Sequence, residues 1–213
     1  MTNFIPIFPL SLIVYPGERL NLHIFESRYK QLIAECFEQK KLFGIPAVID
    51  NDLKELGTLV EITSIEKTYE DGTMDISTRG VKVFRTLEVV KDIPEKLYSG
   101  AIVTYPDDAA DGNRAAMEKL LSRIRQLHLL LKISKDFKKP DAELKAFDVA
   151  HHMGLNPAEE YEVLGLFREA QRQEYLNRHL EKAIAVLLEM ENLKEKVRLN
   201  GHFKNLQSFN FDL

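Results

Sequence analysis

The sequence has a single cysteine, Cys36, among its 213 residues. One cysteine excludes an internal disulfide and any zinc site made of several cysteines. So little cysteine suits a reducing compartment, and the cytoplasm is the compartment we expect. The neighbours Leu32, Ile33 and Phe37 are apolar, which predicts that the Cys36 thiol belongs to the core and is not reactive.

Long uninterrupted hydrophobic runs are also missing. Residues 4–15 are apolar, but Pro6 and Pro9 interrupt them, and no Lys or Arg precedes them as a signal peptide requires. The other apolar runs are too short or too charged to cross a bilayer. We therefore expect no targeting segment, no membrane span and no membrane partner.

Basic charge is not in surplus. The chain has 29 Lys and Arg against 33 Asp and Glu, a formal net charge of −4, so it has no electrostatic footprint for nucleic acid or anionic lipid. Lysines gather around Phe137, but Asp136 and Asp141 dilute them. We interpret this stretch as a solvated loop, with a nucleic-acid contact as the alternative.

The motifs that usually carry phosphate or nucleophile chemistry are absent from the sequence. It has no Gly-x-x-x-x-Gly-Lys-Ser/Thr loop, no Gly-x-Gly-x-x-Gly after a strand and no Gly-x-Ser-x-Gly elbow. We therefore expect no cofactor and no enzymatic activity. An enzyme of unrecognised type is the alternative, which a deep pocket with converging polar side chains would favour.

Two adjacent histidines, His151 and His152, are the strongest lead for a metal site. Adjacent helix residues point about 100° apart, so the two rings do not converge on one ion. Asp148 lies three residues before His151 and is a possible partner in one site. We favour a structural or surface role and predict no metal site. We expect His23, on a strand beyond the first turn, to be packed or hydrogen-bonded.

What the chain does have is turn chemistry. Pro16-Gly17 predicts a type II turn, because Pro presets φ at roughly −65° and Gly accepts positive φ. Asp71-Gly72 between two alternating segments predicts a β-hairpin. We expect Gly17 and Gly80 to be backbone positions that need positive φ or close packing, and not ligand contacts.

Alternating segments dominate the first half of the chain. Strand patterns cover residues 20–24, 43–49, 59–69, 74–79, 81–89 and 98–105. One amphipathic helix interrupts them, since Tyr29, Leu32, Ile33 and Phe37 repeat at helical spacing. Many short, locally connected strands with Gly and Pro at the corners indicate a closed or partly closed β-barrel.

The hydrophobic period becomes helical after residue 106. Helices are predicted over residues 117–131, 140–154, 156–170 and 176–197. Asn156 and Glu159 have the spacing of a capped helix start. The last helix is either a bundle helix or a coiled-coil seam, and we favour the bundle because the other helices need a partner. We divide the chain into 1–106, a helical part 107–199 and a loosely held tail 200–213, with Gly201 ending the last helix.

Three segments resemble the N-terminal, substrate-binding domain of Lon protease. Residues 4–29 contain a proline-punctuated apolar strand, a Pro-Gly turn and an Ile-Phe-Glu-Ser-Arg-Tyr run; residues 56–62 contain Gly-Thr; residues 71–85 contain a hairpin that ends in Gly-x-x-x-Phe. The resemblance implies an α+β fold, in which a PUA-like β-barrel with one inserted helix is followed by a C-terminal α-helical bundle. Because the sequence lacks the ATPase and peptidase motifs that follow this domain in Lon, we expect a stand-alone form without those domains.

The same resemblance implies a non-enzymatic module for protein or peptide recognition. Its partners would be unfolded or partly folded protein segments, and a protease or chaperone that it serves as an adaptor in protein quality control. An RNA-binding PUA-like module is the alternative, which rests on fold analogy.

Side chains near the Pro-Gly turn and the start of the first helix are the candidates for peptide binding. Tyrosine and arginine combine a broad apolar body with a polar tip and are enriched at binding hot spots. The candidates are Tyr15, Arg19, Glu26, Arg28 and Tyr29. Glu26 and Arg28 have a surface ion pair as their alternative role. For Leu20 and Phe25 we favour a place in the core.

Overall fold

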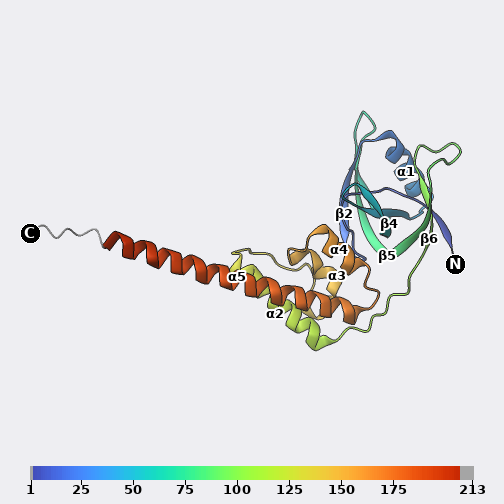
Figure 1. Ribbon diagram of the computed structural model, residues 1–213. Helices are drawn as coiled ribbons and strands as arrows, with labels where there is room; N and C mark the ends of the chain where they lie inside the picture. Colours follow the sequence, from blue (N-terminus) through green and yellow to red (C-terminus); the bar gives the residue numbers. More distant parts are fainter. Residues whose placement is uncertain (1, 207–213) are drawn as a thin grey trace, which may run out of the picture.

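The computed structural model describes residues 2–206, and the first half of the chain forms a six-stranded antiparallel sheet (Figure 1). The strands are β1 (Asn3–Pro6), β2 (Arg19–Ile24), β3 (Phe43–Ile49), β4 (Asp52–Thr68), β5 (Met74–Val90) and β6 (Gly100–Thr104). The hydrogen-bonded order is β1-β6-β5-β4-β3, and β2 pairs with β5. Helix α1 (Ser27–Glu38) lies between β2 and β3 along the chain, so the inserted helix is where the sequence predicts it.

We predicted a closed or partly closed barrel; the strand ladders make an open sheet, so the closed form is wrong. The hydrogen-bonded path ends at β1 and β3, and β2, which pairs with β5 alone, also has an unpaired edge. After β1, isolated bridges join Ile7 to Gly44 and Leu10 to Ala47, so single contacts link this segment to β3. Pro9 lies between the two bridges and has no N–H to donate, which prevents a continuous ladder there.

The long hairpin of β4 and β5 turns at Asp71-Gly72, as predicted. Gly72 has a φ of +76°, and the Asp71 carboxylate accepts a 3.0 Å hydrogen bond from the backbone N–H of Thr73. The structure differs at Gly80, where we expected a break between two strands. There β5 continues, and the register with β4 shifts at Leu59 and Val60, so a β-bulge absorbs the irregularity.

Helix α1 packs one face against the sheet. Its buried residues are Tyr29, Leu32, Ile33 and Cys36. Cys36 is 2% exposed, which confirms the predicted core position, and burial raises the pKa of its thiol to about 11. The prediction for Phe37 is wrong: its side chain is 45% exposed, because it follows Cys36 by about 100° of helix rotation and leaves the buried face.

The second half of the chain is helical. Its elements are α2 (Arg114–Leu130), η1 (Asp141–Glu143), α3 (Ala146–Val149), η2 (Ala150–His152), α4 (Pro157–Leu164) and α5 (Glu169–Leu206). The helix predicted over 140–154 is therefore three short pieces. The cause is the extended backbone at Leu144 and Lys145, where Asp148 accepts a 2.9 Å hydrogen bond from the Lys145 N–H and starts a new helix.

The capped start of α4 is confirmed. Asn156 accepts a 3.0 Å hydrogen bond from the Glu159 N–H, and the Glu159 carboxylate accepts one of 2.8 Å from the Asn156 N–H. This helix ends earlier than we predicted, because Gly165 forms its C-cap. The predicted member Ala170 belongs to the next helix, α5.

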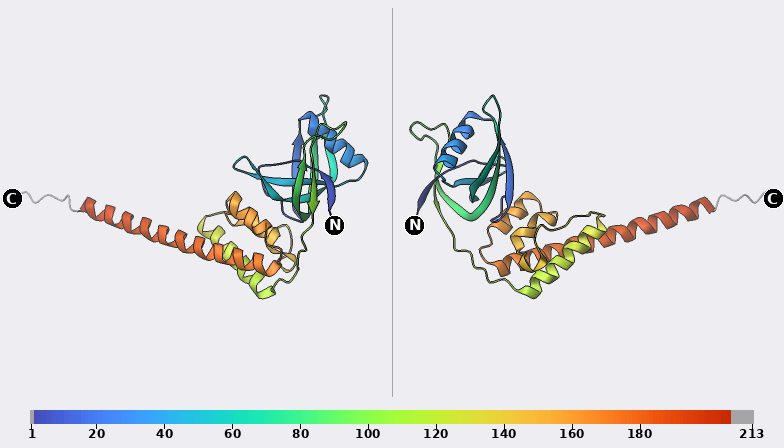
Figure 2. Two further views of the ribbon diagram at one scale, coloured as in Figure 1. Left: turned by 45° about the vertical axis from the view of Figure 1, so that its right-hand side comes forward. Right: turned by 180° about the vertical axis from the view of Figure 1, so that it is seen from behind.

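The first part of helix α5 packs against the rest of the protein, and its later part does not. Leu176, Leu180 and Ile184 are buried and face α2 and the short helices, as a bundle helix requires. Farther along, the helix extends away from the rest of the molecule in every view (Figures 1 and 2). The predicted stop at Gly201 is wrong, because the helix runs to Leu206. Residues 207–213 of the predicted tail lie outside the described residues.

One hydrophobic cluster crosses from the sheet into the helices. It contains Tyr15 and Leu56 from the first half, and Met117 and Phe147 from the second. The boundary between 1–106 and 107–199 stays a prediction, but the two parts share apolar contacts. Within residues 2–206, no helix has the length and apolar character needed to span a membrane.

Candidate binding surface

The Pro-Gly turn is held firmly against strand β5. The Glu18 N–H donates to the Tyr15 carbonyl (3.1 Å) across the turn, and Gly17 has a φ of +87°, as a type II turn requires. The Gly17 N–H donates to the Gly80 carbonyl and the Gly80 N–H to the Glu18 carbonyl, each over 2.8 Å. A Cβ on Gly80 would lie 2.2 Å from the Tyr15 carbonyl oxygen. The backbone requirement predicted for the two glycines is therefore confirmed, by positive φ at Gly17 and by close packing at Gly80.

Tyr15 is buried, which corrects the expectation that it faces outward. Its side chain has no exposed surface, and its ring stacks on Phe147 with centroids 5.0 Å apart. The hydroxyl donates a 3.0 Å hydrogen bond to the Glu160 carbonyl of α4. Burial, reinforced by the nearby Glu160 and Glu18 charges, raises the pKa of Tyr15 far above its usual value. This side chain joins the turn to the helical part.

Tyr29 is buried as well, and the same expectation fails for it. Its ring stacks on Phe8 at 3.9 Å between centroids, and burial raises its pKa against the opposing effect of Arg28. The Arg28 guanidinium lies over this ring, 4.6 Å from its centroid. Arg28 also donates a 2.9 Å hydrogen bond to Glu26. The alternative of a surface ion pair is therefore the arrangement found.

Arg19 is exposed and belongs to a row of exposed side chains along β2. Alternation along the strand places Arg19, Asn21, His23 and Phe25 on one face, and all four are exposed. Phe25 is 64% exposed, so the core position that we favoured for it is wrong. Leu20 is partly buried against the core beneath. We call this row the β2 outer face.

The β2 outer face borders a shallow groove of about 530 Å³. Its lining includes Arg19, Asn21, Ser77, Arg79 and Lys138. The sequence analysis missed Arg79 and Lys138 as site residues. The hairpin pattern could have identified Arg79, because the alternation of β5 places it on the outer face. Its pairing with Arg19 could not be predicted, because local patterns do not specify the register of two distant strands.

A second cleft, of about 510 Å³, lies between the Pro-Gly turn and the helices. Arg79 lines both spaces. On the helical side a buried ion network closes the cleft: the Arg172 guanidinium binds Asp108 at 2.7 Å and Glu169 at 3.0 Å, and lies 4.1 Å from the Phe147 ring centroid. Each charge in this network has a partner, so removal of one member would leave a buried charge without compensation and destabilise the junction.

The two adjacent histidines have separate surroundings. His151 lies between two carboxylates, with Nδ1 2.7 Å from Glu160 and Nε2 3.1 Å from Glu18. His152 packs against Phe137, and burial lowers its pKa to about 4. Asp148 is paired with Lys139. Among the described residues, no group of three or more His, Cys, Asp or Glu side chains is arranged to hold a metal ion.

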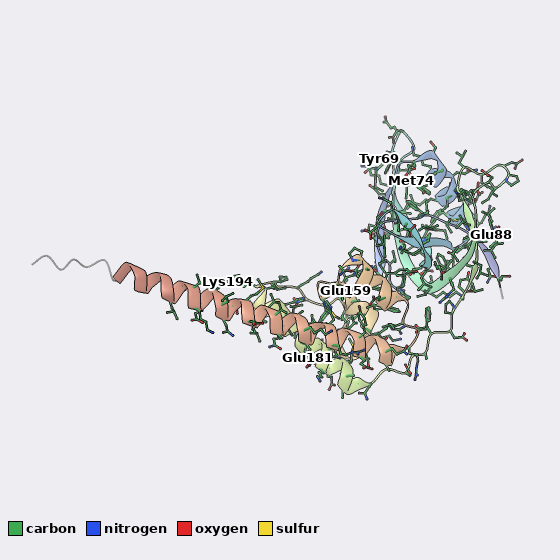
Figure 3. The ribbon with its side chains drawn as sticks, viewed as in Figure 1. Tyr69, Met74, Glu88, Glu159, Glu181 and Lys194 are labelled. Atoms are coloured by element: carbon green, nitrogen blue, oxygen red, sulfur yellow. The ribbon has the colours of Figure 1, made fainter. Side chains whose placement is uncertain are left out.

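His23 is hydrogen-bonded, as expected. Its Nδ1 lies 2.6 Å from Asp75, directly across the strand pair. Asp75 also accepts a 2.7 Å hydrogen bond from the Tyr69 hydroxyl near the hairpin tip, where Tyr69 is labelled in Figure 3. The pKa of Asp75 is lowered by these two hydrogen bonds. The group forms an aromatic and polar end of the β2 outer face, next to Phe25.

These features define an α+β domain in which a rigid sheet presents charged and aromatic side chains to solvent. The chain belongs to the family described as the ATP-dependent protease La (LON) substrate-binding domain, which matches residues 5–182. The Lon protease of Parabacteroides distasonis is 30% identical over 131 residues, which cover 58% of this chain and 16% of that protein.

Solved structures show the same fold. A Lon N-terminal domain protein from Xanthomonas campestris superposes with a TM-score of 0.61 at 21% identity, over 82% of this chain and 96% of that one. The N-terminal domain of a Mycobacterium avium complex Lon protease gives 0.59 at 13% identity, over 84% and 98%. At such identities, the likeness concerns the fold alone.

Proposed function

We propose that the chain is a non-enzymatic recognition module that binds unfolded or partly folded segments of other proteins. The observation that carries the proposal is its membership, over residues 5–182, of a family described as a substrate-binding domain. The solved relatives are N-terminal domains of Lon proteins, and the matched curated relative is a Lon protease. The family description names substrate binding, and since the substrates of a protease are proteins, we infer that the chain recognises protein segments.

The surface on β2 and the start of α1 suits this role. Phe25 offers exposed apolar area, and Arg19 and Arg28 offer flat, charged groups that bind carboxylates and stack on aromatic rings. These side chains are carried by a sheet and a helix, so little ordering is needed when a partner binds. We retain Arg19, Glu26 and Arg28 as proposed contact residues.

We further propose that the module acts as an adaptor, delivering bound segments to a protease or chaperone in the cytoplasm. In fold, we propose that the sheet with its bridged edges corresponds to a PUA-like barrel and the helices to its C-terminal bundle. The bridges from Ile7 and Leu10 to β3 and the packing of α2 along α5 support that correspondence.

Binding of an unfolded client tests the proposal. Reduced and alkylated casein, labelled with a fluorophore, is titrated with the purified chain and followed by anisotropy, with native folded albumin as the matched control. We expect saturable binding of the casein and not of the albumin. The absence of casein binding contradicts the proposal, and tighter binding of poly(U) RNA than of casein favours the RNA-binding alternative.

The non-enzymatic part of the proposal has its own test. We expect the purified chain neither to hydrolyse ATP nor to cleave casein, because its sequence has no phosphate-binding loop and no nucleophile elbow. ATP-dependent casein cleavage that a point substitution in this chain abolishes would overturn it.

A further inference from the structure

Strand β2 has one edge that is not paired. Its ladder is with β5 alone, and Figure 1 shows it at the left side of the sheet. The hydrogen bond from the Gly80 N–H to the Glu18 carbonyl sets the phase of this ladder. Because backbone groups alternate in direction along an antiparallel strand, Leu20 and Leu22 face β5, and Arg19, Asn21 and His23 face away.

The outward backbone groups have no hydrogen-bond partner within residues 2–206. Arg19, Asn21 and His23 are also exposed. An exposed edge with free N–H and C=O groups is a template on which another strand is able to pair. In natural proteins, proline or a β-bulge often prevents such an edge from pairing with another strand. Strand β2 contains neither over its register of six pairs.

Charge distinguishes one end of this edge. Arg19 and Arg79 lie directly opposite each other in the register, and their pair is of the type without mutual backbone hydrogen bonds, in which side chains come closest. Two like charges in this position repel. Within residues 2–206 neither arginine forms an ion pair, although Glu61 of β4 lies opposite Arg79 in the register. Lys138 adds a third positive charge to the same groove, and Glu66 is the one carboxylate of its lining, so three positive charges face one negative charge.

The other end of the edge is aromatic. Phe25 is 64% exposed, the His23 ring stacks on it at 6.3 Å between centroids, and the Tyr69 ring meets His23 edge-on at 6.0 Å. Strand residues advance roughly 3.3 Å each, so Arg19 and His23 are separated by a distance that about five residues of an extended peptide span.

We propose that a protein segment adds to the free edge of β2 as a further strand, with acidic side chains against Arg19 and Arg79 and an apolar side chain against Phe25. The inference rests on the proposed function and specifies its substrate class. Backbone pairing supplies sequence-independent affinity, and alternate side chains supply the selectivity. A strand edge recognises a polypeptide backbone, and the carboxylates of Glu66 and Asp75 along the same face oppose a nucleic-acid backbone.

A charge reversal tests the acidic preference. The probes are two fluorescein-labelled peptides of alternating valine and threonine with a phenylalanine at one end, carrying two glutamates or two lysines at the other. We expect the wild type to bind the glutamate peptide. Double substitution of Arg19→Glu and Arg79→Glu should weaken that binding by more than about tenfold and make the lysine peptide the better ligand, because like charges at an interface repel.

The matched control carries the same change of charge elsewhere. Arg178→Glu with Lys182→Glu alters two exposed residues of α5 and should leave both affinities unchanged. Melting temperatures of all variants establish that they fold. Unchanged binding of the glutamate peptide by the folded Arg19→Glu, Arg79→Glu variant overturns the proposal, as does tighter binding of poly(U) than of the glutamate peptide.

Backbone methylation tests the added strand. Two versions of the glutamate peptide are N-methylated at odd or at even positions, so that each keeps the N–H groups of one edge. Pairing with β2 requires one version to bind and the other to fail; equal binding of both overturns the added strand. The casein titration distinguishes the proposed function from the proposed site. If the charge-reversed variant still binds casein, the chain still recognises unfolded segments, but β2 is not the site where it binds them.

Discussion

Gly17 and Gly80 are hydrogen-bonded to each other, yet each requires glycine for a different reason. Gly17 has positive φ and open space around its Cα, whereas Gly80 lies against the Tyr15 carbonyl. We expect Gly17→Ala to lower the free energy of unfolding by about 1 kcal/mol through backbone strain. Gly80→Ala should cost more, about 2–3 kcal/mol, because the new methyl group displaces the turn.

Urea unfolding of the two variants measures these losses. Gly154→Ala is the control, since Gly154 has a φ of +70° and no atom within 4 Å of the place that an added methyl group would take, and should behave like Gly17→Ala. If Gly80→Ala unfolds at the same urea concentration as the parent, the turn is not docked on β5 as described.

The pair of arginines across β2 and β5 gives a second prediction for a single residue. Arg19→Glu replaces a like-charge pair by an opposite-charge pair with Arg79, and it leaves in place the pairing of Arg79 with Glu61 of β4. We expect the free energy of unfolding to rise by about 0.2–1 kcal/mol and the gain to shrink at high salt. Thermal melts at two salt concentrations measure it; a lower melting temperature at both would mean that the two side chains do not face each other.

Burial of single side chains was the least predictable feature of the proposed surface. The turn containing Tyr15 follows from Pro16-Gly17, but its inward direction depends on Phe147 and on the Glu160 carbonyl, which are distant in sequence. The core position predicted for Phe25 was wrong in the opposite sense, because β2 ends before this residue and no element covers its side chain. Local patterns specify the turn, and tertiary packing decides which face of it is covered.

At the scale of elements, predictions based on turn and cap residues succeeded. Asp71-Gly72 and the Asn156 cap depend on contacts within a few residues, so the sequence contains all the necessary information. The predicted helix over 140–154 failed because Leu144 and Lys145 are extended and Glu169 of α5 accepts a 2.8 Å hydrogen bond from the Ala146 N–H. A contact between distant elements there replaces a turn of helix.

The contact between the Pro-Gly turn and α4 should depend on pH. Burial lowers the pKa of His151, but its hydrogen bonds and attraction to Glu18 and Glu160 raise it more, so that the net shift is upward. Both ring nitrogens donate only when the ring is protonated. Because the pKa of His151 is higher in the folded than in the unfolded state, protonation of its ring stabilises the fold. This contribution is complete below the unfolded pKa of about 6.5, and it disappears as the pH rises through the folded pKa.

Comparison of the parent with His151→Gln across pH checks this expectation. The stability advantage of the parent should be largest at about pH 6 and should decline toward about pH 8.5. The side chain of His151 is 32% exposed, so added salt should reduce the advantage as well. An advantage that is constant over this pH range would show that the ring does not titrate there.

At the scale of the whole molecule, the free part of α5 contributes little to the core. Val186, Leu193 and Val197 are more than half exposed, and Figure 3 shows Lys194 on the segment that extends from the body. We expect a chain that ends after Leu188 to melt within about 2 °C of the full chain, because a domain of this size shifts by roughly 2–4 °C per kcal/mol. Circular dichroism melts of the two chains measure the difference; a drop of about 10 °C would show that the segment packs on the body.

The sheet and the helices should unfold as one unit, although the sequence changes character near residue 106. The cluster that contains Tyr15 and Leu56 also contains Phe147 and Leu176, so neither half can unfold without exposing the apolar surface of the other.

Phe147→Ala removes the ring that stacks on Tyr15 and should lower the free energy of unfolding by about 3 kcal/mol, as truncation of a buried phenylalanine usually does. Helix signal by circular dichroism and tyrosine fluorescence, to which five tyrosines of residues 1–106 and two of the helical part contribute, should then show the same lowered melting temperature. Leu193→Ala, at a position 62% exposed on the free part of α5, is the control and should leave both transitions in place. Two separated transitions in Phe147→Ala, with the sheet melting as in the parent, would mean that residues 1–106 fold independently and that the shared cluster does not couple them.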